Sequence, residues 1–196
     1  SAGFISSGGK KFTVKLPAQR KVTNSKKTDF DSAITAFDAA PYGATLVDKI
    51  ATARKALTEL TAKRAAISKL QISVPKMAGY YTPTIGKLLV IVEEMAVLSS
   101  DATLTKAIAA YTSFLQGKER AGIERAMGAA GFSSGKFTPA VYQKFVGLIA
   151  AQNDLLAVFR KHASDGQIAF YSQTMTGAPV EGTNSLRKIA IDSPAK

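Results

Sequence analysis

The sequence contains no cysteine and no tryptophan, and its single histidine is His162. The absence of cysteine excludes disulfide bonds and cysteine-based zinc sites, and one histidine cannot supply the usual ligand set of a metal site. A cysteine nucleophile is excluded for the same reason, and a serine–histidine pair would depend on His162 alone. We therefore expect a protein that is not an enzyme and that uses no metal or other cofactor.

Long apolar runs are also missing. Runs such as residues 88–92 fall far short of the roughly 20 residues that cross a bilayer. The N-terminus does not have the pattern of a signal peptide. The 196 residues are enough for one domain or two small helical bundles with a core that needs no disulfide. We expect a soluble piece of chain.

Acidic residues are few, with 14 Asp and Glu against 26 Lys and Arg, which gives a formal net charge of +12. More than half of this excess precedes the first acidic residue, Asp29. A basic segment of this kind can contact nucleic acid or an anionic membrane, or it can be a solvated surface that keeps the protein soluble. We favour the solvated surface and do not expect nucleic acid as a partner, because no aromatic residues interleave with these cations. The cations are Lys10, Lys11, Lys15, Arg20, Lys21, Lys26 and Lys27.

Apolar residues recur at intervals of three and four through most of the chain, which is the period of amphipathic helices. Helices are predicted over residues 17–40 and 46–70, with loops over 1–13 and 131–137. Thr82-Pro83 and Thr138-Pro139 each predict an N-cap followed by proline in the first turn, and Asp101 predicts another cap. No stretch alternates with period two. The sequence therefore predicts an all-α fold.

A short pattern near the N-terminus recurs in the second half. Ala-Gly-Phe, Ser-Ser-Gly and Lys-Phe occur in this order at residues 2–12 and again at 130–137, and a Pro-Ala pair comes after each copy. This order predicts two duplicated helical halves, with approximate boundaries 1–100 and 101–196. Helices of the predicted length suit antiparallel bundles.

Charged residues interrupt a small, apolar helix between Leu115 and Phe132. At about 100° per residue, Arg125 shares a helix face with Tyr111 and is predicted to point toward the packed side, whereas Arg120 is predicted to be solvated. A buried guanidinium needs an anion. The anion can be a Glu or Asp of a neighbouring helix or a small ligand, and both alternatives stay open. Glu119 and Glu124 could hold Arg125 in place or compete with a ligand for it.

The residues Leu115, Glu119, Gly122, Glu124, Arg125 and Ala126 resemble an arginine motif of the nitrate- and nitrite-sensing (NIT) domain, found in bacterial chemoreceptors and transcription antiterminators. Residues 1–20 are similar to the segment directly after the family's first motif, a Glu-Arg-Gly triplet that this chain does not contain. The first of the two arginines that the family links to its ligand would therefore lie before Ser1. The resemblance covers nearly the whole length.

The resemblance implies two four-helix bundles in a single sensor domain, 1–196, with the first helix missing. It also implies a nitrate or nitrite ligand and, as candidate binding residues, Arg125, Glu119, Glu124, Arg120 and Tyr111. A planar guanidinium can engage two oxygens of a flat anion, which makes Arg125 the leading candidate.

From the same resemblance we expect a homodimeric, periplasmic domain of an inner-membrane chemoreceptor (a methyl-accepting chemotaxis protein), with a cytoplasmic location as the alternative. Such a domain would pass a helix displacement to a signalling module. The competing functions are a helical dimerisation scaffold without a ligand and a basic nucleic-acid-binding module.

Overall fold

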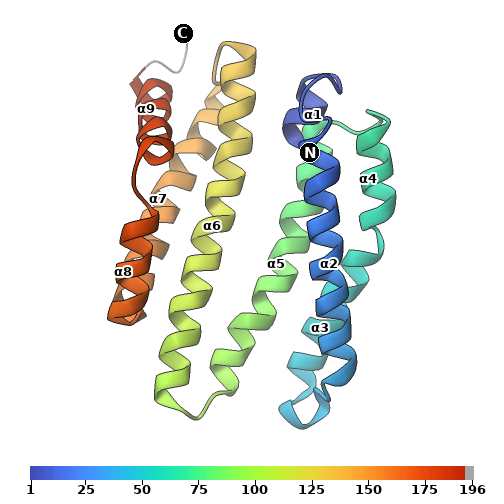
Figure 1. Ribbon diagram of the computed structural model, residues 1–196, viewed down its shortest axis with the longest axis vertical. Helices are drawn as coiled ribbons and strands as arrows, with labels where there is room; N and C mark the ends of the chain where they lie inside the picture. The colour runs from blue at the N-terminus through green and yellow to red at the C-terminus, as the bar shows by residue number, and fades with distance from the viewer. Residues whose placement is uncertain (193–196) are drawn as a thin grey trace. The chain divides into compact units, whose positions relative to one another are not determined.

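The computed structural model describes residues 1–192, apart from the side chain of residue 133, and the regular elements in that range are all helical (Figure 1). The all-α prediction is confirmed. The chain divides into two compact units, Ser1–Glu94 and Met95–Lys196, which we call unit 1 and unit 2. The sequence alone places this division at residue 100.

Unit 1 contains the short helix α1, the long helix α2 and most of the long helix α5, with α3 and α4 between α2 and α5 in the chain. Its core comes mainly from residues of α3 and α4 that recur at three and four, which confirms the periodicity in these two helices, together with Met77 of α5. The elements are α1 (Ala2–Ser6), α2 (Lys15–Ala36), a 3₁₀ turn η1 (Ala40–Tyr42), α3 (Ala44–Thr58), α4 (Leu60–Ser68) and α5 (Val74–Leu98). The buried apolar residues are Leu46, Ile50, Ala53, Ala56, Leu60, Ile67 and Met77.

Unit 1 differs from prediction at three places. Helix α1 lies inside the predicted loop, and the predicted helix 46–70 is broken at Glu59. Thr82-Pro83 is not a helix start, because α5 continues through Pro83. Proline removes one helical hydrogen bond and crowds the carbonyl four residues earlier. Met77 and Thr84 are buried on either side of it, so tertiary packing keeps this helix continuous.

Unit 2 consists of α6 (Ala102–Ser134), α7 (Pro139–His162), α8 (Asp165–Thr174) and α9 (Ala178–Asp192). Two predicted caps are confirmed: the Asp101 carboxylate accepts the Leu104 N–H at 2.7 Å, and the Thr138 hydroxyl accepts the Val141 N–H at 3.4 Å. The predicted loop 131–137 is wrong in its first part, since α6 continues to its C-cap, Gly135.

Glycines bring α6 and α7 close together. A Cβ on Gly117 would lie 3.7 Å from Leu155 Cβ, and one on Gly128 would lie 3.3 Å from the Phe145 ring. Phe145 belongs to the core of unit 2, with Phe137 and Ala190. The small residues of α6 therefore face α7. Because this face has no stripe of large apolar residues, the sequence does not reveal it as the buried one.

The duplicated pattern has the same packing in both units. A Cβ added to Gly3 would lie 2.4 Å from the Phe12 ring, and one added to Gly131 would lie 2.4 Å from the Phe137 ring. In each copy the glycine is the second residue of Ala-Gly-Phe, and the ring belongs to the Lys-Phe pair. A glycine at this position lets the aromatic ring pack directly on the helix backbone in both copies.

Candidate functional site

All five candidate binding residues lie on α6, where the helix axis separates them. At about 1.5 Å of rise per residue, Tyr111 and Arg125 are roughly 21 Å apart along the axis. Tyr111 is 53% exposed. One small anion cannot contact both side chains, so the prediction that places Tyr111 in the same site as Arg125 is not supported by this geometry.

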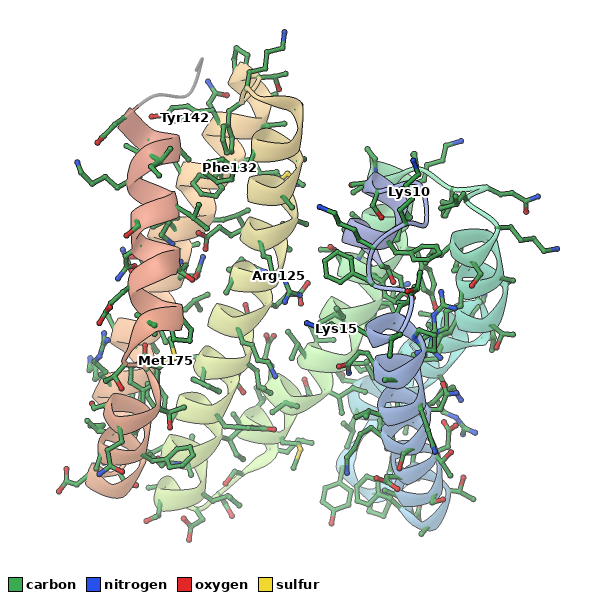
Figure 2. All side chains as sticks on the ribbon, turned by 45° about the horizontal axis from the view of Figure 1, so that its top comes forward. Lys10, Lys15, Arg125, Phe132, Tyr142 and Met175 are labelled. Carbon is green, nitrogen blue, oxygen red and sulfur yellow. The ribbon has the colours of Figure 1, made fainter. Side chains whose placement is uncertain are left out.

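Arg125 is exposed, which contradicts the prediction that it points toward the packed side of its bundle. The packed face of α6 is instead marked by Gly117, Glu124 and Gly128, which are all buried. Figure 2 shows Arg125 on the side of α6 away from α9. The spacing from Tyr111 is misleading, because this aromatic ring is exposed on the same face and does not mark the core.

Glu124 is the charged residue of α6 that points inward, with a relative exposure of 5%. Its carboxylate accepts two hydrogen bonds from Arg187 of α9, from Nε to Oε1 and from Nη2 to Oε2, both 2.6 Å long. Gln152 of α7 donates to Glu124 Oε2 at 2.6 Å, and its own Oε1 accepts from Arg187 Nη2 at 2.8 Å. We call these three residues the Glu124 clamp.

The clamp joins α6, α7 and α9 through a connected polar network. The Gln152 amide also donates to the Leu148 carbonyl at 3.0 Å. The hydrogen bonds to Glu124 raise the pKa of Arg187, burial opposes this rise, and the negative charge of Glu124 adds to it. Bidentate, charge-assisted pairs of this kind fix both distance and orientation, so the clamp fixes how these three helices pack.

Arg187 is the residue that sequence reasoning missed. It is one helical turn from the buried Ala190 on the last predicted helix, which is a weak signal that it faces the bundle. No motif connects it with Glu124, 63 positions earlier.

The alternative in which Arg125 forms an intramolecular ion pair with a Glu or Asp has no support in unit 2. Among the described residues of this unit, no side chain forms a hydrogen bond or ion pair with Arg125, and Glu124 is bound to Arg187 instead. The Arg125 guanidinium is therefore exposed without a carboxylate from its own bundle.

Glu119 and Arg120 are both half-buried, so the prediction of a solvated Arg120 is only partly right. Burial raises the pKa of Glu119, and the positive charge of Arg120 opposes this rise. The Glu119 carboxylate lies over Gly122, 3.9 Å from where a Cβ on that residue would be. Glu119 lies about one and a half helical turns before Arg125 and on another face of α6.

Metal clusters and membrane spans are both missing from the described part of the chain. Residues 1–192 contain no group of three or more His, Cys, Asp and Glu side chains that could hold a metal ion. No helix within the same residues is long and apolar enough to cross a membrane.

Comparisons with known proteins agree with one another. The sequence model of a family described as nitrate and nitrite sensing matches residues 1–196. A nitrate regulatory protein of Klebsiella oxytoca is 31% identical over 171 residues, which cover 87% of this chain and 43% of that protein. The structure of the NasR transcription antiterminator matches with a TM-score of 0.89 at 29% identity, over 96% of this chain and 51% of that chain. This chain thus spans about half the length of these relatives.

These relatives correct part of the functional expectation. One is named a regulatory protein and the other a transcription antiterminator, and neither name describes a chemoreceptor. The expectation of a membrane chemoreceptor in chemotaxis is therefore wrong, and so is the periplasmic location that we inferred from it. The expectation that nucleic acid is not a partner is not supported either, because one relative is named a transcription antiterminator.

Proposed function

This chain belongs to the family of nitrate and nitrite sensing domains. From this membership and from the names of its relatives, we propose that it binds nitrate or nitrite for a protein that regulates transcription. The domain acts as a sensor and not as an enzyme. Ligand binding displaces a helix of the bundles, and this displacement reaches an output module elsewhere in the protein. The observation that carries the residue-level proposal is the exposed guanidinium of Arg125.

Arg125 suits a flat oxyanion for two reasons. Its guanidinium is a planar fork that can donate to two nitrate oxygens at once, which the point charge of lysine cannot do. It also needs no rearrangement of an internal ion pair, because the neighbouring Glu124 is bound by Arg187. Glu119 and Arg120 remain candidates for orienting this side chain, whereas Tyr111 is too distant to share one ligand with it.

RNA is the partner that we infer for the output of the whole protein, because one relative is a transcription antiterminator. Two lysines of the basic N-terminal segment are paired within α2, Lys26 with Asp29 at 3.1 Å and Lys27 with Asp31 at 2.5 Å. These two lysines are therefore less available for an RNA contact, and we place that contact outside this chain. Binding of this chain to RNA with a steep salt dependence would contradict that placement.

The test of the ligand site is calorimetric titration with nitrate of the wild type and of Arg125→Lys. Lysine keeps the charge and loses the fork, so we expect the affinity to fall at least about tenfold, which is about 1.4 kcal/mol. The melting temperature should not change, because Arg125 has no partner within the described part of its bundle.

Arg54→Lys is the matched control, since Arg54 is an exposed arginine on α3. Its affinity for nitrate should equal that of the wild type. Equal affinity in Arg125→Lys would remove Arg125 from the site. A wild-type chain that binds neither nitrate nor nitrite would favour the alternative of a dimerisation scaffold without a ligand.

A further inference from the structure

A hollow of about 440 Å³ lies between the α3–α4 segment and α5 of unit 1, where both helical paths are irregular. The first path is broken at Glu59, and the second contains Pro83. Because proline has no N–H, it leaves the Gly79 carbonyl without its helical donor. Glu59, Gly79 and Pro83 all line the hollow, and a Cβ added to Gly79 would meet no atom within 4 Å. We call this space the α4–α5 hollow.

Two polar contacts hold α5 against the opposite wall of the α4–α5 hollow. The Tyr80 hydroxyl donates to the Ala56 carbonyl at 3.0 Å. This carbonyl belongs to the last turn of α3, where carbonyl groups have no helical partner. Further along the two helices, Lys49 of α3 forms an ion pair with Glu94 of α5. The hollow therefore lies between walls that are tied to each other.

The α4–α5 hollow opens on a side of these helices that does not face α2. Lys63 and Tyr80 line it, and the Lys63 Nζ lies 5.5 Å from the centre of the Tyr80 ring. The next residue of each helix turns toward α2: Arg64 donates to a side-chain carbonyl of α2, and Tyr81 lies near Arg20 of α2. Successive residues of a helix point about 100° apart, so the hollow is distinct from the space between α2 and α4.

The charge of the α4–α5 hollow is positive, because three lysines and one glutamate line it. Glu59 pairs with Lys63 at 3.2 Å. Lys76 and Lys87 of α5 have no ion pair among the described residues. Positive charges that surround a cleft concentrate its field and attract anions. At about 1.5 Å per residue, these two lysines are roughly 16 Å apart along α5, so they suit an anion longer than a single phosphate group.

We propose that the α4–α5 hollow binds a small molecule that carries a chain of phosphate groups. Lys76 and Lys87 contact the negative charges of the chain from its two ends, and Lys63 contacts it from α4. Lysine suits this ligand, because an ammonium group binds phosphate as a point charge and does not need the planar geometry that an arginine fork requires. The site is separate from Arg125, which lies in unit 2.

The first test is calorimetric titration of the 196-residue chain with inorganic tripolyphosphate. Binding should be saturable, and Lys76→Met/Lys87→Met should weaken it at least about tenfold. Lys106→Met/Lys118→Met is the matched control, because it removes two exposed lysines that are 12 positions apart on one helix, α6. Its affinity should equal that of the wild type. Equal losses in the two double variants, or no saturable binding to the wild type, would overturn the proposal.

The second test fills the α4–α5 hollow without removing a charge. Gly79→Leu places a side chain in open space that the ligand needs, so it should weaken tripolyphosphate binding at least about tenfold and leave the helix content unchanged by circular dichroism. Gly86→Leu is the control, since Gly86 is on the same helix, has the same open space at its Cβ and does not line the hollow. Unchanged affinity in folded Gly79→Leu would place the binding elsewhere and contradict the proposal.

Two competitors complete the experiment. Saturating nitrate should not displace tripolyphosphate, and Arg125→Lys should keep its tripolyphosphate affinity, so this proposal and the nitrate site can fail separately. Displacement by nitrate would mean that both anions share one site, against the proposal. A single-stranded RNA that binds more tightly than tripolyphosphate, and that Gly79→Leu also weakens, would overturn the assignment of a small molecule and make nucleic acid the ligand of the hollow.

Discussion

Replacement of Arg187 by methionine tests whether the Glu124 clamp stabilises unit 2. The substitution keeps a long apolar side chain and removes three hydrogen bonds of 2.6 to 2.8 Å. It leaves the Glu124 carboxylate, 5% exposed, with only the Gln152 amide as a partner among the described residues. Breaking a buried ion pair from one side costs about 3–5 kcal/mol, because the remaining charge is desolvated without compensation.

The lower end of this range applies here, because the Arg187 side chain keeps 23% of its exposure and methionine restores part of the packing. About 3 kcal/mol in a unit of this size lowers the melting temperature by at least about 10 °C. Thermal unfolding followed by circular dichroism measures this drop. Lys188→Met is the control, because Lys188 is the next residue and its ion pair with Asp192 is on the surface; it should change the melting temperature little.

The double variant Glu124→Met/Arg187→Met separates the cost of an unpaired charge from the value of the pair. Removal of both partners leaves no buried charge in the clamp, so the double variant should be more stable than either single variant. If Arg187→Met melts at the same temperature as Lys188→Met, or if the double variant is the least stable of the set, the clamp does not stabilise the unit as argued.

The packing of Gly131, the pKa of Glu119 and the family membership give three further predictions. Gly131→Ala should destabilise unit 2 by about 1–3 kcal/mol, since its Cβ would lie 2.4 Å from the buried Phe137 ring. Gly147→Ala, whose Cβ would lie in open space, should leave the stability unchanged or raise it. Chemical denaturation measures both free energies of unfolding. Burial raises the folded-state pKa of Glu119, so the folded protein loses stability as the pH rises through this value. Glu119→Gln should therefore raise the melting temperature at pH 7. This gain should disappear below about pH 4, where the carboxyl group is protonated in both the folded and the unfolded protein. The chain should form a homodimer, and a strict monomer at all concentrations in sedimentation, with and without nitrate, would contradict this.

Helix periodicity predicted the fold well, because the core of unit 1 is built from apolar residues at regular spacing. It failed where packing depends on groups that carry no such signal. The buried face of α6 is marked by Gly117, Gly128 and Glu124, so an apolar stripe pointed to the wrong side of this helix. At Pro83, the local signal for a helix start was overridden by packing of the residues around it.

The candidate site was predictable only in part. The family motif located Glu124 and Arg125 but not their directions, and no pattern indicated Arg187, because an ion pair between helices depends on how the bundle closes. The hydrogen bond from the Arg20 guanidinium of α2 to the Arg64 carbonyl of α4 joins residues 44 positions apart, and it is hidden in the sequence for the same reason.

The adjacent residues Glu124 and Arg125 of α6 can make contacts on two different sides of the helix, since successive residues of a helix point about 100° apart. Glu124 points inward and holds α7 and α9 through Arg187 and Gln152, while Arg125 points outward with its guanidinium free of that network. The two roles can therefore be measured apart. Arg187→Met should lower stability and leave the nitrate affinity of the folded fraction unchanged, whereas Arg125→Lys should lower the affinity and leave stability unchanged. If each substitution changed both quantities in proportion, the pair would be one structural unit, and Arg125 would not be free to recognise a ligand.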